Sequence, residues 1–246
     1  MNQTLSLLFS HHSDRSFTDE PVSEEALCSI LEAARRAPTT SNAQHLSVIV
    51  VRDAARRARI AEFAGNQAWI AKAPVFLALV IDVHKTGVAV AAAGGKLVYP
   101  ETVESLLASV TDAGIALATM LTAARSLGLG IVPIGGIRRD PQAIINFLEL
   151  PPNTFPLVGM CVGHVDKPGK QKPRLPMEAF RHDERYHREG IAEAIAAYDA
   201  VLLQYGKDAG QANAKTWSQG TVEAYQYADG RPVKSILQKQ GFTLTR

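Results

Sequence analysis

The sequence predicts a protein of the α/β or α+β class, in which helices flank a central sheet. Three observations lead to this prediction. Runs of β-branched or wholly apolar residues have the length of strands, and segments with apolar residues at helical spacing lie between them. The composition, 46% hydrophobic and 20% charged residues in a chain of 246, is typical of a protein with a substantial core.

The first half of the chain begins with two predicted helices and a strand. A short helix is expected over residues 4–10. A second helix begins after Ser23, whose hydroxyl suits the N-cap position, and ends before Pro38. Leu46–Val51 is rich in β-branched residues and predicts a strand, which a helix over residues 54–64 follows.

The middle of the chain contains the clearest strand and the clearest helix. Residues 73–81 are apolar on both faces, which predicts a central strand. Residues 83–101, with Gly94-Gly95 and Pro100, fit neither pattern and are interpreted as a mobile excursion. The helix expected over residues 103–127 has small side chains nearly all round, so we expect it to lie between layers or against a copy of itself.

The second half adds two strands and two helices. Residues 131–134 form a strand that ends in two glycines, and a short helix is expected over residues 141–148. Residues 155–163 form another strand. A loop rich in Lys, Pro and Gly follows, and a polar tail from Met177 onward is expected to contain one helix, over residues 191–205.

The overall charge and the apolar runs exclude several classes of protein. A net charge of +2, with basic and acidic residues interleaved, argues against nucleic-acid binding. The apolar runs at residues 5–9 and 73–81 are too short for a signal peptide or a membrane span. Cys28 and Cys161 both lie in apolar runs, which predicts buried free thiols in a reducing compartment. We therefore expect a soluble cytoplasmic protein that does not bind membranes.

Three basic clusters are the most informative local features. They are His11-His12-Ser13-Asp14-Arg15, Ile137-Arg138-Arg139 after Gly135-Gly136, and Lys170-Gln171-Lys172-Pro173-Arg174. Basic side chains beside hydroxyls and glycines are suited to a phosphate monoester. If the first and third clusters meet in space, they form a site for a small phosphorylated ligand. The alternative is that each is an ordinary solvated loop.

Two other segments could contact a flat or heteroaromatic ligand. Pro133-Ile134-Gly135-Gly136 exposes backbone N–H groups after a strand, although a plain turn is equally possible. Thr39-Thr40-Ser41-Asn42 and Gln67 carry hydroxyl and amide groups, although helix-terminating turns have the same composition. The histidines lack metal-ligand spacing, so no metal site is expected. No catalytic nucleophile or carboxylate pair is recognisable, which favours a cofactor as the reactive group.

Taken together, motifs along nearly the whole chain resemble the nitroreductase superfamily of flavoenzymes, in particular its oxygen-insensitive NADPH nitroreductase and flavin reductase branch. The motifs are His11-x-Ser13-x-Arg15-x-Phe17-Thr18-Asp19-Glu20-Pro21-Val22, residues 33–44, Gln67, Asp112, Ser126-Leu127-Gly128-Leu129-Gly130, Ile134-Gly135-Gly136-Ile137-Arg138, Gly159-x-Cys161-x-Gly163, Lys172-Pro173-Arg174-Leu175-Pro176, Thr216-Trp217-Ser218 and Lys239-Gln240-Gly241-Phe242. The first block and the K-P-R-L-P block are the most specific.

The resemblance implies an α+β fold with a central mixed sheet wrapped by helices, in an intertwined homodimer with two FMN molecules at the interface. It implies a single nitroreductase-like domain over residues 1–246, whose C-terminal segment, about residues 177–246, extends to the partner subunit. It also implies the cofactor-binding residues. His11, His12, Ser13, Asp14, Arg15, Lys172 and Arg174 belong to the phosphate and ribityl segments, and Thr39, Ser41, Gln67, Pro133, Ile134, Gly135 and Gly136 surround the flavin ring.

The function implied by the resemblance is an FMN-dependent NAD(P)H oxidoreductase that reduces nitroaromatics, quinones or flavins by two electrons in a ping-pong reaction. No catalytic side chain is required. Relatives bind the 2′-phosphate of NADPH with arginines where this chain has Lys207, Asp208 and Lys215, so the sequence leaves the choice between NADPH and NADH open. The alternatives are a specialised flavin enzyme of the superfamily, dehalogenase-like or flavin-consuming, and a non-catalytic flavin-binding protein.

Overall fold

The computed structural model describes residues 2–227 and 230–246. The chain forms two compact units, one of Met1–Gly169 with Arg231–Arg246 and the other of Lys170–Gly230. The sheet and most of the core belong to the first unit. No partner chain is present, so the expectation of one domain with a C-terminal extension to a partner remains a prediction.

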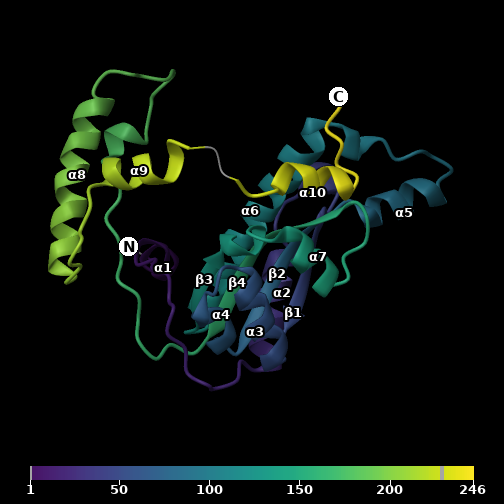
Figure 1. Ribbon diagram of the computed structural model, residues 1–246, viewed down its shortest axis with the longest axis horizontal. Helices are drawn as coiled ribbons and strands as arrows, with labels where there is room; N and C mark the ends of the chain where they lie inside the picture. Colours follow the sequence, from purple (N-terminus) through teal and green to yellow (C-terminus); the bar gives the residue numbers. More distant parts are fainter. Residues whose placement is uncertain (1, 228–229) are drawn as a thin grey trace. The chain divides into compact units, whose positions relative to one another are not determined.

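A four-stranded sheet lies at the centre of the first unit (Figure 1). Its strands are β1 (Leu46–Val51), β2 (Val75–Asp82), β3 (Gly130–Ile134) and β4 (Thr154–Gly163), in the order β1-β2-β4-β3. The α+β class is confirmed, and β2 is a central strand as predicted. Every pairing between the described strands is antiparallel, so the expected mixed sheet is wrong in that respect.

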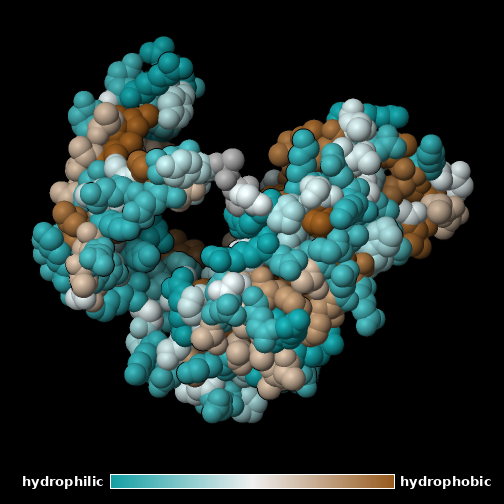
Figure 2. Space-filling view, in the orientation of Figure 1, coloured by the Kyte–Doolittle hydropathy of each residue, from teal (hydrophilic) through white to brown (hydrophobic). Residues whose placement is uncertain are grey.

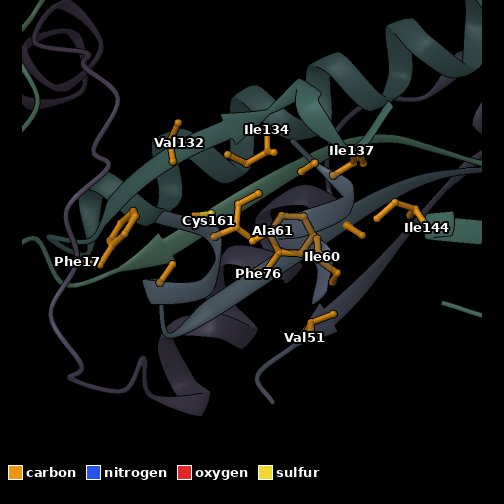
Figure 3. Close-up of a cluster of buried hydrophobic side chains, with 14 residues drawn as sticks. Phe17, Val51, Ile60, Ala61, Phe76, Val132, Ile134, Ile137, Ile144 and Cys161 are labelled. Atoms are coloured by element: carbon orange, nitrogen blue, oxygen red, sulfur yellow. The ribbon is translucent and has the colours of Figure 1, made fainter. Parts of the chain in front are cut away.

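One face of the sheet is covered by α3 (Ala54–Phe63), α4 (Ala68–Lys72) and α7 (Pro141–Phe147). Figure 3 shows Phe76 of β2 pointing into this layer, close to Ile60 and Ala61 of α3 and to Cys161 of β4. Burial of a side chain of this size stabilises the fold by about 1.5–3 kcal/mol.

The opposite face is covered by α2 (Glu24–Arg35) and α6 (Val103–Ser126). Leu77 and Leu79 of β2 point to these helices, whereas Phe76 and Ala78 point to the other layer. This alternation explains why β2 is apolar at every position: a strand with helices on both faces has no solvent side.

Most of the predicted helices begin and end close to the expected residues. The first is α1 (Gln3–Phe9), and α2 begins after Ser23, whose hydroxyl accepts a hydrogen bond from the backbone N–H of Ala26. The carboxylate of Asp53 caps α3 in the same way, through the N–H of Arg56. These caps satisfy backbone donors that a helix start leaves free.

The long helix α6 packs with one face and exposes the other. Ala113, Ala116, Met120 and Ala124 are buried, whereas Val103, Leu107, Val110 and Ile115 are 38–58% exposed. Among the described residues α6 alone is long and apolar enough to cross a membrane, but the core helix of a soluble protein meets the same criteria. The first unit therefore leaves one apolar face of α6 uncovered.

Several elements were not expected from the sequence. Residues 83–101 contain a regular helix, α5 (His84–Ala92), and the 3-10 turn η2 (Tyr99–Glu101), so the mobile excursion is wrong. The described residues of the tail from Met177 onward contain three α-helices instead of one. Cys161 is buried as predicted, but Cys28 is exposed on α2 because it lies opposite the Leu27 and Ile30 stripe.

The C-terminal helix α10 (Val233–Lys239) returns to the first unit. Its Ile236 and Leu237, with Phe242 beyond it, join Ile81 and Phe155 in a third apolar cluster at one end of the sheet. This helix was not predicted from the sequence because the tail is polar and the apolar face of the helix is narrow and short.

The second unit contains the 3-10 turn η4 (Met177–Ala179) and the helices α8 (Ile191–Asp208) and α9 (Trp217–Tyr225). Tyr198 of α8 packs edge to face on Trp217, with ring centroids 6.3 Å apart, a favourable geometry for an aromatic pair. The Tyr198 hydroxyl donates to the main-chain oxygen of Pro173 at 2.9 Å. Figure 2 shows hydrophobic side chains at the surface of α8, where Val201 is 51% exposed.

Candidate active site

The segment His11–Arg15 is fixed to the first unit by the carboxylate of Asp14, which is 1% exposed. One carboxylate oxygen accepts a hydrogen bond from the backbone N–H of Gly169 at 3.0 Å, and the other lies 3.4 Å from the N–H of Ile131. The Asp14 N–H in turn donates to the Ile131 carbonyl at 2.9 Å. Asp14 therefore ties three chain segments together and points its side chain into the protein.

Two basic side chains complete the surroundings of Asp14. Nε2 of His12 lies 3.3 Å from one carboxylate oxygen, and Nη1 of Arg125 on α6 lies 3.8 Å from the other. Gly169 permits this close packing, since a Cβ there would lie 2.2 Å from the main-chain oxygen of Ser13. The glycine and the buried aspartate thus determine how the basic segment passes the sheet.

Arg15 contacts α4, and Gln67 directly precedes this helix. The guanidinium of Arg15 is 5.5 Å from the centre of the Trp69 ring, a cation–π contact. Gln67, immediately before α4, donates from Nε2 to the Ala64 carbonyl at 2.9 Å. Its amide also abuts Gly136, where an added Cβ would lie 2.0 Å from Nε2. Only glycine allows this approach.

The edge strand β3 runs from the His11–Arg15 segment to the contact between Gln67 and Gly136. Asp14 is bonded to Ile131 near the start of β3, and Gly135 and Gly136 follow directly after its end at Ile134. The predicted site residues His11 to Arg15, Gln67 and Pro133 to Gly136 are therefore arranged along one strand. A strand advances about 3.3 Å per residue, so the two groups are separated by roughly the length of an extended small molecule.

Asp112 of α6 fixes the loop from Thr39 to Gln44 by hydrogen bonds. Both carboxylate oxygens accept from the backbone N–H of Thr40, at 3.0 and 3.1 Å, and one accepts from its hydroxyl at 3.0 Å. Ser41, Asn42 and Gln44 have positive φ angles of 50°, 55° and 53°. Such angles are uncommon for residues other than glycine and often mark functional sites. Thr39 lines a cavity of about 330 Å³ with Gln44 and Asp112.

A buried histidine lies beside this loop. His45 is 2% exposed, stacks on Tyr99 with ring centroids 5.3 Å apart, and has an Nδ1 atom without a hydrogen-bond partner. Burial lowers the pKa of His45 below its ordinary value, an effect that Asp112 and Asp82 oppose and Lys85 reinforces. Burial therefore favours the neutral form of the His45 ring.

The second unit holds the two remaining predicted residues. Lys172 lines a cavity of about 390 Å³ together with Trp217 and Tyr225, and Arg174 donates to the main-chain oxygens of Lys172 and Pro173 at 3.1 and 3.2 Å. Their convergence with Arg15 remains a prediction. Within the described part of the chain no group of three His, Cys, Asp or Glu side chains could hold a metal ion.

Several residues of the site were not identified as such from the sequence. Trp69, Arg125 and Gly169 carry no local motif, because their roles arise from contacts between distant segments. Asp112 appeared only within the family resemblance, and its bond to Thr40 spans 72 residues. The residues present suit a phosphorylated flat ligand: basic groups at one end of β3, and an amide and bare backbone at the other.

The chain belongs to the nitroreductase family. The model of the "Nitroreductase family" matches residues 8–164, and that of the "Nitroreductase family, C-terminal domain" matches residues 172–245. The boundary between the two matches falls where the chain divides into its two units.

Individual relatives extend over the whole chain. An FMN reductase [NAD(P)H] of Bacillus subtilis is 41% identical and covers 100% of both chains. An oxygen-insensitive NADPH nitroreductase of Salmonella typhimurium is 34% identical over 98% of this chain and 99% of its own. The solved structure of NfrA2 of B. megaterium is 39% identical, with a TM-score of 0.97 over 100% of both chains.

Proposed function

We propose that the protein is an FMN-dependent NAD(P)H oxidoreductase that reduces nitroaromatics, quinones or free flavins by two electrons. The observation that carries this proposal is the arrangement along β3 of Arg15, Gln67 and the Gly135-Gly136 backbone, in a chain 41% identical from end to end to an FMN reductase. Bound FMN supplies the chemistry, namely acceptance of a hydride from NAD(P)H and its transfer as two electrons to the acceptor.

The basic segments bind the phosphate end in this proposal. His11, Ser13 and Arg15 of the first unit supply donors, whereas the ring nitrogens of His12 already have Ser10 and Asp14 as partners. The participation of Lys172 and Arg174 is the expectation that the family resemblance gives. Asp14 does not touch the ligand, because its oxygens are already bonded to Gly169 and Ile131. Its part is to hold the segment in place. The Trp69 ring helps to position the Arg15 guanidinium through a cation–π contact.

The other residues orient the ring. Gln67 and the backbone of Pro133, Ile134, Gly135 and Gly136 would contact the bound ring, and donors directed at a ring that gains charge would stabilise its reduced form. Thr39 and Ser41 come from the loop held by Asp112. No side chain acts as an acid or a base in this proposal, so catalysis rests on orientation and fixed dipoles.

The family resemblance and the surface of α6 both support a homodimer. Val103, Leu107, Val110 and Ile115 form an exposed apolar face, and Gly114 on the same side has open space around its Cα. A second copy packed on this face buries these side chains. Gly114→Leu is expected to weaken the dimer by preventing close helix contact, measured as a shift toward monomer in analytical ultracentrifugation, whereas Ala58→Leu on the exposed face of α3 leaves it unchanged. A tight dimer in Gly114→Leu refutes this interface.

We infer the use of both NADH and NADPH from the residues that, by the family resemblance, correspond to the 2′-phosphate site. Lys215 is bonded to both carboxylate oxygens of Glu223, at 2.6 and 2.8 Å, and Asp208 accepts from Gln204 at 2.7 Å. Neither arrangement offers a free arginine to a 2′-phosphate. A cytoplasmic location completes the proposal.

Arg15→Ala tests the phosphate site directly. Loss of a charge-assisted hydrogen bond is expected to weaken FMN binding by about 1.5–3 kcal/mol, or roughly 10- to 150-fold. The measurement is FMN retained after dialysis, followed by its visible absorbance. Arg59→Ala is the matched control, since Arg59 also lies over an aromatic ring, Phe63, at 4.6 Å, but is an exposed residue of α3 that is not proposed to bind FMN. Equal retention by both variants contradicts the site. A yellow protein inert to both donors identifies the non-catalytic alternative.

A further inference from the structure

Arg57 of α3 is a buried guanidinium without an anionic partner. It is 9% exposed, and Nη1 donates to the main-chain oxygen of Arg52. Among the described residues no carboxylate lies within 4.0 Å of it, and its Nε atom is buried with no hydrogen-bond partner. Burial of an unpaired charge is strongly unfavourable. A buried, unsatisfied group of this kind points to a missing ion or ligand.

The Arg57 side chain lines a cavity of about 340 Å³ at the end of the sheet where β1 finishes and β2 begins. Lys72, the last residue of α4, lines the same cavity and makes no hydrogen bond or ion pair with the described residues. Arg52 lines it too, but its charge is neutralised by an ion pair with Glu24. Two cationic side chains from different helices therefore line one cavity, and neither has an anionic partner among the described residues.

The remaining wall defines the kind of anion that fits. Asp19 contributes one negative charge, so Arg57, Lys72 and Asp19 together leave one positive charge uncompensated. The other lining residues are apolar: Pro21, Val22, Pro74 and Val75. A monoanion with a short apolar body matches both properties, whereas a phosphate dianion exceeds the available charge and has no apolar part.

We propose that this cavity binds the carboxylate of a small organic acid, with Arg57 and Lys72 as its cationic partners. Charge-assisted hydrogen bonds from guanidinium and ammonium groups suit a carboxylate. The cavity is separate from the proposed flavin site, since none of the residues proposed to bind FMN lines it. Lys72 and Trp69 are three residues apart on α4, so the acid binds to the helix that supports Arg15.

The test is a titration of the FMN-saturated protein with butyrate, read out as the midpoint of thermal unfolding. Sodium chloride at matched ionic strength and inorganic phosphate are titrated in parallel. Butyrate is expected to raise the midpoint saturably, by ligand linkage. Lys72→Gln is expected to raise the butyrate concentration for half of the effect about tenfold. The control Lys96→Gln removes an exposed lysine elsewhere in the first unit and should respond like the wild type.

Three results overturn the proposal. They are a butyrate response equal to that of chloride, an unchanged response in Lys72→Gln, and a saturable response to phosphate but not to butyrate. Arg57→Met provides a second check, because it removes the unpaired charge and should abolish the response without lowering the ligand-free midpoint. A large fall in that midpoint shows that the protein already compensates Arg57. The cavity contains none of the residues proposed to bind FMN, so the same titration can be repeated on the protein without added FMN and remains decisive even if the proposed function fails.

Discussion

Two segments proposed to bind the cofactor are each held by a buried aspartate, but the two aspartates act in opposite directions. Asp14 belongs to its own segment and reaches outward to the N–H groups of Gly169 and Ile131. Asp112 belongs to α6 and reaches the loop from outside, through the N–H and hydroxyl of Thr40. The first arrangement ties three parts of the chain together, and the second positions one loop.

The two aspartates also differ in charge compensation and in backbone strain. Asp14 lies near His12 and Arg125, whereas no basic side chain among the described residues lies within 4.0 Å of Asp112. The loop at Asp112 contains three residues with positive φ, and no residue of the His11–Arg15 segment has a positive φ. The comparison suggests that the phosphate segment is part of the folded core and that the loop is positioned locally.

Asp14→Ala is expected to have the largest effect on this comparison. It leaves Arg125, whose side chain is 14% exposed, without its carboxylate, and frees the Gly169 N–H. Removing one partner of a buried pair typically costs about 3–5 kcal/mol, and the 3.8 Å separation places the expected loss near the lower limit. Urea unfolding measures it. Asp166→Ala, which removes only an exposed bond from Ser16, is the control, and an equal loss in both variants contradicts the proposed role of Asp14.

Asp112→Ala is expected to have a smaller and more local effect. It removes the acceptor for the N–H and hydroxyl of Thr40, which is expected to lower the free energy of unfolding by about 1–2 kcal/mol. It leaves no charged side chain without its partner. Hydrogen exchange at the Thr40 amide should become fast while exchange in β2 stays slow. Glu104→Ala, on an exposed part of the same helix, should change neither. Loss of protection throughout the sheet would show that Asp112 stabilises the whole core.

These two anchors show how far the sequence could predict the site. The His11–Arg15 motif and the central strand at residues 73–81 are local patterns, and both were recognised. The bond from Asp112 to Thr40 and the contact of Gln67 with Gly136 join residues 72 and 69 positions apart, so no local pattern encodes them. The helix α5 was missed because its alanines, glycine and valines form no apolar stripe, and none of its residues is buried.

Replacement of His45 is expected to have the smallest effect on stability. This effect depends on pH, which distinguishes the region of the Thr39–Gln44 loop from the segment at Asp14. Its pKa is lowered in the folded state, chiefly by burial, so the unfolded chain binds the proton more readily. The stability it contributes is present above about pH 6.5, the ordinary histidine value, and falls as the pH drops below it, by at most about 1.4 kcal/mol per pH unit.

Unfolding midpoints recorded between pH 7.5 and 5.5 measure this contribution. Asp112, Asp82, Lys85 and Tyr99 surround the ring and remain in every variant. His45→Gln should lose stability less steeply on acidification than the wild type. The exposed His84→Gln should keep the wild-type slope. Identical slopes in all three proteins would show that His45 does not titrate differently on folding.

The central claim is that a bound flavin, positioned along β3, transfers the electrons. The most direct test is the visible spectrum of the purified protein with FMN, recorded anaerobically before and after addition of NADH or NADPH. The account predicts the absorbance of oxidised flavin, its bleaching by at least one donor, and its return when a quinone is added. A protein that retains no flavin, or whose flavin neither donor bleaches, would contradict the account.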